Sequence, residues 1–184
     1  MKKTLLSAVM IASFGVAALA SQAARALDGT ITFTGKVVAN TCVFKVNGGS
    51  SSNTVVLPVV FTSALTAAGN VAGNTTFTIS ATGCDPNLTS VQAYFSGSNI
   101  DTNGYLKNTG TGAANNVEVQ LLNGTNSTPM PLNAATATAQ NSPVGTVSSS
   151  GAATLSYAAQ YIAVGGAATA GLVNTSVSYT INYL

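Results

Sequence analysis

The chain has 184 residues, a length that suits one domain with its own hydrophobic core and leaves little room for a second. Only 5% of its residues are charged, against about 25% in an average soluble domain. It contains no histidine, which excludes a Ser-His-Asp triad and a Cys-His pair, and its net charge of +2 comes from a basic start that we expect to be removed, so nucleic-acid binding has no support.

Residues 1–26 are typical of a secretory signal peptide. A basic start precedes an almost unbroken apolar run over residues 5–20, and small residues follow. The run is shorter than a bilayer span of about 20 residues, so we do not expect a membrane anchor. Cleavage is possible after Ala20, Ala23 or Ala26, because each site has small residues at positions −3 and −1. We favour Ala26, and we expect the mature protein to be soluble and exported.

The mature chain would carry little charge. Cleavage after Ala26 leaves three lysines and four acidic residues, a net charge of 3 − 4 = −1. Near-zero net charge promotes association. Two explanations fit this composition: a small extracellular domain solubilised by Thr, Ser and Asn, or a subunit whose surface is largely covered by copies of itself.

The first predicted strand begins at the start of the mature chain and runs on through residues 36–38 toward Cys42. Its apolar face, by the period of two of a strand, comprises Leu27, Gly29, Ile31, Phe33 and Gly35. The residues between them are Asp28 and three threonines, so the other face is polar. A lone strand of this kind is unstable until its apolar face meets a sheet, in its own domain or in another molecule.

The rest of the chain predicts short strands separated by turns. After a turn at residues 48–52, an apolar segment at 54–60 suits an edge strand or a bulge, because Pro58 interrupts it. One helical turn is expected at 63–68. Further strands are expected at 75–82, 91–96, 117–122, 153–164 and 173–184, with loops and one short strand over 123–151. This pattern indicates an all-β sandwich.

The two cysteines, Cys42 and Cys84, are expected to form a disulfide, because exported chains fold in an oxidising compartment. Closing the loop between them should stabilise the fold by about 4 kcal/mol. We expect no metal site, since two thiolates without histidine do not complete a zinc shell. We also expect no cofactor.

Catalytic residues are not apparent in this sequence. A glycosidase needs two convergent carboxylates, and only Asp85, Asp101 and Glu118 lie in the body of the domain. We interpret these three as solvated surface charges. No glycine-rich phosphate loop is present, and we do not expect an enzyme.

The end of the chain carries a more specific pattern. Val177, Tyr179, Ile181 and Tyr183 alternate with polar residues, Tyr183 is penultimate, and Gly171 is fourteenth from the end. This pattern resembles the C-terminal signature of pilins assembled by the chaperone-usher pathway. The glycine-flanked segment at 29–35, the position and spacing of the two cysteines, and the tyrosines of 157–161 resemble the same family. The nearest resemblance is to a type 1-like major fimbrial subunit.

The resemblance implies an incomplete immunoglobulin-like sandwich over residues 36–184 that lacks its last strand and so has an open groove. Residues 27–35 would be an N-terminal donor strand. Leu27, Gly29, Ile31, Phe33 and Gly35 would enter the groove of the next subunit, with Gly29 where no Cβ fits. Gly171, Val177, Tyr179, Ile181 and Tyr183 would belong to the strand that the periplasmic chaperone and the outer-membrane usher recognise.

The function implied is a structural subunit of a cell-surface fimbria, with identical or related pilin subunits as partners and no small-molecule substrate. A minor pilin or tip adaptor of the same system is an alternative. A carbohydrate-binding adhesin is less favoured, because such proteins usually add a lectin domain and the chain has no length for one. A self-contained secreted sandwich, with the first strand folded back into its own groove, also stays open.

Overall fold

The computed structural model of the chain describes residues 31–35, 37 and 42–184. The expected signal peptide, Leu27 and Gly29 lie outside the described residues. The chain divides into two units, Met1–Lys36 and Val37–Leu184. The second unit contains all the strands that follow.

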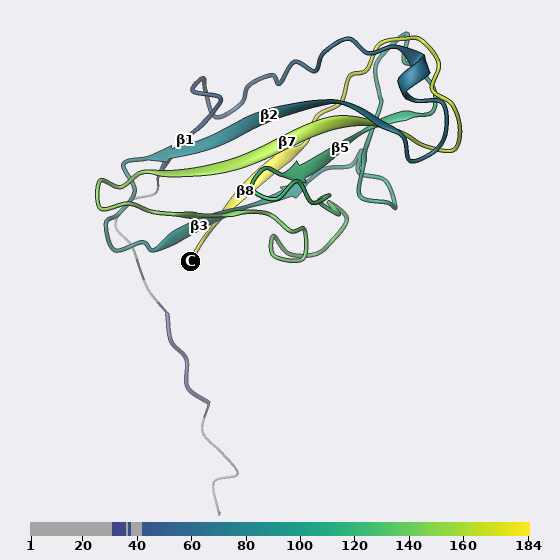
Figure 1. Cartoon of the computed structure of the whole chain (residues 1–184). Coiled ribbons are helices and arrows are strands. Elements are labelled where there is room, and N and C mark those ends of the chain that lie inside the picture. The colour runs from purple at the N-terminus through teal and green to yellow at the C-terminus, as the bar shows by residue number, and fades with distance from the viewer. Residues whose placement is uncertain (1–30, 36, 38–41) are drawn as a thin grey trace, which may run out of the picture. The chain divides into compact units, whose positions relative to one another are not determined.

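Two antiparallel sheets form this unit (Figure 1). Its strands are β1 (Val43–Val46), β2 (Val71–Thr82), β3 (Ser90–Ser96), β4 (Leu106–Lys107), β5 (Val117–Asn123), β6 (Val144–Thr146), β7 (Ala153–Ala163) and β8 (Ser178–Tyr183), with a 3-10 turn, η1, at Thr62–Ala64. One sheet has the order β1-β2-β7-β5-β4 and the other the order β6-β3-β8. The predicted all-β sandwich is confirmed. None of the helices in the described ranges is long and apolar enough to cross a membrane.

The core lies between the two sheets and is built around aromatic rings. Tyr157 of β7 is fully buried and stacks on Phe77 of β2 at 5.3 Å between ring centroids. Phe95 of β3 meets the same tyrosine edge-on at 5.1 Å, so one ring joins both layers. Ile79, Leu121 and Leu155 extend this cluster along the five-stranded sheet.

Cys42 and Cys84 are bonded to each other, as predicted, and both are buried. Cys42 immediately precedes β1, and Cys84 follows the end of β2. Because β1 and β2 pair from Val43↔Thr82 to Val46↔Ile79, the disulfide closes one end of this hairpin-like pair.

Three predicted elements differ from the structure. The first strand is not continuous up to Cys42: residues 31–35 form no strand, and β1 begins only at Val43. The segment 54–60 forms no strand, because no described strand lies beside it to complete a ladder. The last strand is shorter than predicted and starts at Ser178, opposite Ser96, where its partner β3 ends. The two-residue β4 was not predicted.

Candidate functional site: an open apolar groove

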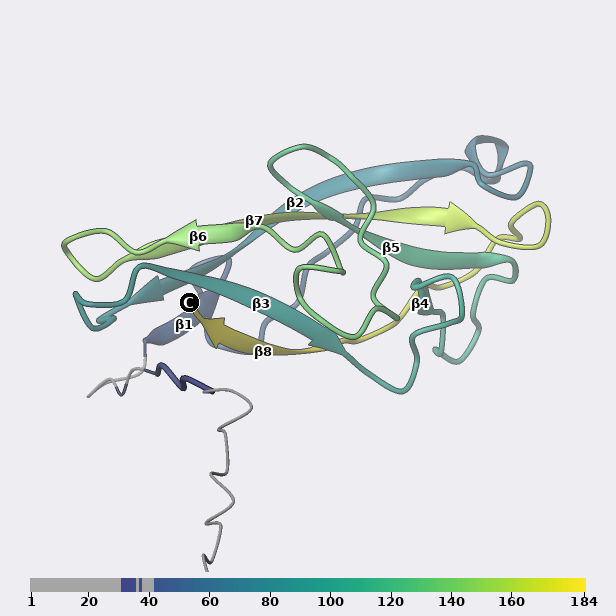
Figure 2. The same ribbon diagram turned by 90° about the horizontal axis from the view of Figure 1, so that it is seen from below.

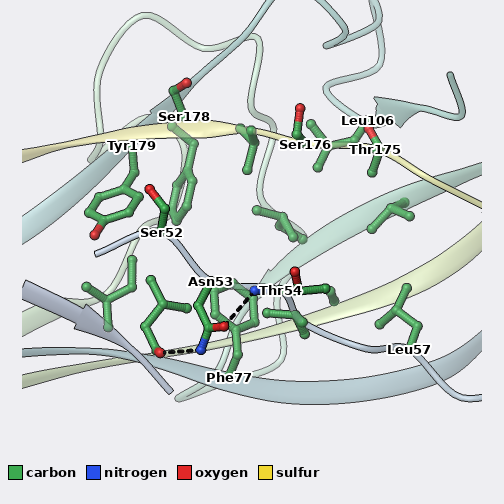
Figure 3. A pocket seen from close by; sticks show the side chains of 18 of the residues that line it. Ser52, Asn53, Thr54, Leu57, Phe77, Leu106, Thr175, Ser176, Ser178 and Tyr179 are labelled. Carbon is green, nitrogen blue, oxygen red and sulfur yellow. Dashed lines mark hydrogen bonds between the residues drawn. The ribbon is translucent and has the colours of Figure 1, made fainter. Parts of the chain in front are cut away.

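A groove of about 1120 Å³ opens along one side of the sandwich. Residues 51–57 form one lip and residues 173–179 form the other, and Figure 3 shows side chains of both lips facing each other. The floor is made of core side chains: Phe44, Val46, Phe77, Ile79, Phe95, Leu106, Val119, Leu121, Ala159 and Tyr161. The groove therefore opens onto the hydrophobic core, and the side chains of Phe44 and Tyr161 are half-buried there.

The lip at 173–182 has a regular alternation of burial. Its odd-numbered side chains, from Val173 to Ile181, are half-buried, and the even-numbered ones between them are exposed. β8 pairs with β3 along one edge, and no strand of the described chain pairs with its other edge. A half-buried apolar face beside an unpaired strand edge is the arrangement that accepts an added strand.

The opposite lip continues along residues 54–61. Val55, Leu57 and Val60 are half-buried, whereas Val59 and Phe61 are 97% and 82% exposed. Within residues 42–184, no backbone hydrogen bond joins 54–60 to a strand. Both lips thus offer unpaired backbone groups to whatever lies between them.

A second hollow of about 510 Å³ extends the groove past η1. The two hollows share Tyr161 and Val173. The ring of Tyr161 fits there because Gly73 has no side chain: a Cβ on Gly73 would lie 2.9 Å from Cδ2 of Tyr161. Gly73 has a φ of +70° and lies where the β2–β7 register shifts, so this bulge makes room for the ring that divides the groove floor.

Comparisons with known proteins identify the family of this groove-bearing sandwich. Residues 31–184 match the family model described as "Fimbrial protein". The chain belongs to the fimbrial protein family. It is therefore a structural fimbrial subunit, exported to fimbriae at the cell surface, where it assembles with other pilin subunits.

Individual relatives agree with this assignment. The major fimbrial subunit SMF-1 of Stenotrophomonas maltophilia (strain K279a) is 44% identical over 171 residues, covering 90% of this chain and 98% of the relative. The F17 fimbrial protein of Escherichia coli is 46% identical over 175 residues, covering 91% and 94%. Among solved structures, the P pilus rod subunit PapA has a similar fold, with a TM-score of 0.54, 18% identity and coverage of 84% and 100%.

In this fimbrial subunit, the predicted C-terminal set lies along one lip. Val177 and Tyr179 line the groove, and Ile181 is half-buried on the same face of β8. The hydroxyl of Tyr179 donates a hydrogen bond to the carbonyl oxygen of Ser51 on the opposite lip, at 2.8 Å. Tyr183 is 37% exposed, with its ring centroid 6.4 Å from that of Phe44.

Gly171 lies where the lip begins, and its lack of a side chain has a local reason. A Cβ on Gly171 would come within 2.5 Å of the backbone nitrogen of Ala114. The next residue, Leu172, forms a parallel bridge with Ala113. Only glycine permits this close approach of two backbones, which fixes the path of the chain into the groove.

The described part of the predicted donor strand is exposed. Ile31 and Phe33 are 80% and 89% exposed, and nothing lies within 4 Å of a Cβ built on Gly35. Leu27 and Gly29 lie outside the described residues. The roles of all five residues remain predictions.

The prediction that all three carboxylates are solvated is wrong for Glu118. This side chain is half-buried, and its Oε2 atom has no hydrogen-bond partner in the portion of the chain that the structure covers. Burial raises the pKa of Glu118, the neighbouring Asp101 raises it further, and Lys107 lowers it. Across the described ranges, no three His, Cys, Asp or Glu side chains gather as metal ligands would.

Sequence reasoning missed several residues that shape the groove. It assigned 54–60 to a sheet edge or bulge and not to a groove lip, it gave no role to Gly73, and it placed Tyr161 in a strand without a role in the groove. The segment is almost continuously apolar, so its sequence did not show that Val55 and Leu57 would face the groove. The contact between Gly73 and Tyr161 joins residues far apart in the chain, so no local pattern could have revealed it.

Proposed function

We propose that this fimbrial subunit polymerises head to tail, with residues 27–35 of one copy lying as a strand in the groove of the next. The observation that carries the proposal is the groove itself: an apolar floor between two lips with unpaired backbone groups. A strand placed between the lips would pair with β8 and cover the floor, which an isolated domain leaves open to water.

The donor segment has the side chains that such a site requires. Leu27, Gly29, Ile31, Phe33 and Gly35 share one face of an extended strand. Burying Ile31 and Phe33, which are exposed in the single chain, should contribute about 1.5–3 kcal/mol each. A head-to-tail contact that does not close into a ring repeats without end, and the product is a filament.

The same groove explains why assembly would need helper proteins. Before a donor strand arrives, its apolar floor is a hazard for aggregation. A periplasmic chaperone would cover the groove first, using the lip that contains Gly171, Val177, Tyr179, Ile181 and Tyr183. An outer-membrane usher would then exchange the chaperone for the next subunit's donor strand.

This proposal also divides the chain into three segments. Residues 1–26 act as the signal peptide, 27–35 as the donor strand and 36–184 as the pilin domain. The domain is assigned no catalysis and no cofactor, because no histidine and no charged side chain is among the residues that line its groove, so their hydroxyl groups have no base beside them.

Denaturant-resistant ladders test the polymerisation. Surface material is separated on a denaturing gel before and after boiling, beside a variant that lacks residues 27–33. We expect a ladder that collapses to monomer on boiling and is missing in the variant. An equally stable monomer from both proteins would contradict the proposal and would favour a self-contained sandwich.

A further inference from the structure

Strand β3 has a second edge, on the side away from β8, and that edge is closed in an unusual way. Ser90 exchanges both backbone hydrogen bonds with Leu184, next to β8. In an antiparallel pair such bonds recur at every second residue, so Gln92 and Tyr94 also face β8, while Ala93 and Phe95 face the other edge. On that edge β6 pairs with β3 only over residues 90–92.

The side chain of Gln140 takes the place of a strand at Phe95. It is fully buried in the loop between β5 and β6, which runs beside β3 (Figure 2). Its Oε1 accepts a hydrogen bond from the Phe95 N–H at 2.9 Å, and its Nε2 donates to the Phe95 carbonyl at 2.8 Å. This is the two-bond exchange that a residue of a neighbouring strand would make. Nε2 also donates to the Leu132 carbonyl at 2.8 Å, which ties the amide to its own loop.

Two further buried contacts hold the loop that carries Gln140 beside β3. The buried hydroxyl of Tyr157 lies 3.1 Å from Oγ of Ser142. The Ser142 carbonyl in turn accepts a hydrogen bond from Nε2 of Gln92 at 2.8 Å. Both backbone groups of Phe95 are thus bonded to a side chain where no strand is present.

We propose that Gln140 is a positioning residue that helps confine strand acceptance to the groove, by closing the part of β3 that β6 leaves uncovered in the described three-stranded sheet. This inference rests on the proposed function. Sheet edges are usually protected by charged side chains, and β3 has none over Ser90–Ser96. In a protein whose assembly depends on adding strands, the buried amide supplies that protection.

The variant Gln140→Met tests this inference, because methionine has a similar length and shape but cannot form the bonds to Phe95. Gln160→Met is the matched control. Gln160 is also buried, and its Nε2 donates to Oε1 of Gln120 at 2.8 Å, away from the edge of β3. Fibres of each protein, in which the grooves are already filled by neighbours, are incubated with a labelled peptide of residues 27–35.

We expect wild-type and Gln160→Met fibres to take up peptide at their ends alone, and Gln140→Met fibres to take up several-fold more along their length. Mere destabilisation would not add a second acceptor, so equal uptake by both variants would overturn the inference. Failure of the wild type to form fibres would instead overturn the proposed function.

Hydrogen exchange in the wild-type chain keeps the inference testable if Gln140→Met does not fold. The amide of Phe95 should be protected as strongly as those of Gln92 and Tyr94, which face β8. Fast exchange at Phe95 would mean that the edge is open, and would overturn the role given to Gln140.

Discussion

At the scale of single residues, the groove depends on two glycines whose lack of a side chain leaves room for neighbouring groups. Gly73 leaves space for the ring of Tyr161 in the groove floor, and Gly171 lets the start of one lip touch the backbone at Ala114. Sequence reasoning selected Gly171 only by its distance from the end of the chain. Its physical reason, a contact with a residue far away in the sequence, became visible only in the fold.

Gly171→Ala should destabilise the domain by about 1–3 kcal/mol, because the added Cβ meets backbone that cannot move aside cheaply. Gly166→Ala is the control, since a Cβ there would lie 3.5 Å from its nearest neighbour, Nδ2 of Asn116. Urea unfolding of the two variants measures the difference. Equal midpoints would show that the contact at Ala114 gives way easily.

Glu118→Gln should remove a pH dependence from stability. The folded state raises the pKa of Glu118, so between the ordinary carboxyl pKa and this raised value the folded state binds more protons than the unfolded one. Stability is therefore fully present at lower pH and falls as pH rises through that window. Melting temperatures from about pH 4 to pH 8 should fall less in the variant.

Lys107→Gln provides the opposite test of the same site. Lys107 lies across the β4–β5 ladder from Glu118 and lowers its pKa, so removing it should widen the window in which stability is lost. Parallel melting profiles for wild type and both variants would show that the Glu118 carboxyl is solvated after all.

At the scale of elements, the two groove lips explain where sequence patterns succeeded and where they did not. The alternation over 173–184 correctly predicted a strand, but only Ser178–Tyr183 forms one, because β3 offers no partner beyond Ser96. The segment 54–60 has strand-like composition but no strand neighbour in the described residues. Strand-like composition predicts an extended segment, but a ladder also needs a neighbouring strand.

Phe33→Asp should abolish the ladder, because the donor strand would bring a carboxylate onto the apolar floor of the groove. Thr32→Asp is the matched control: it adds the same charge on the polar face of the same segment. Gel analysis of unboiled fibres compares the two. Ladders of equal length would remove Phe33 from the buried face of the donor.

At the scale of the whole molecule, the sequence was enough to predict the class of fold. It did not reveal that Gln140 closes the edge of β3. Regularly spaced turns and alternating strands were enough to predict an all-β sandwich, and two cysteines in an exported chain predicted the bond between Cys42 and Cys84. Gln140 gave no signal, since it lies in a long polar stretch where amides are common. Its importance comes from full burial beside Phe95, which only the tertiary structure provides.

The disulfide between Cys42 and Cys84 should also affect how the domain resists a pulling force. In a filament under tension, the pull from one subunit would reach the next domain through the chain that leads to Cys42, directly before β1. Without the bond, that pull would unzip β1 from β2 one residue pair at a time. With it, the force passes directly to the adjacent end of β2 as well, so that both strands carry the load and β1 cannot be pulled away alone. Reduced fibres should therefore yield at lower force than oxidised ones.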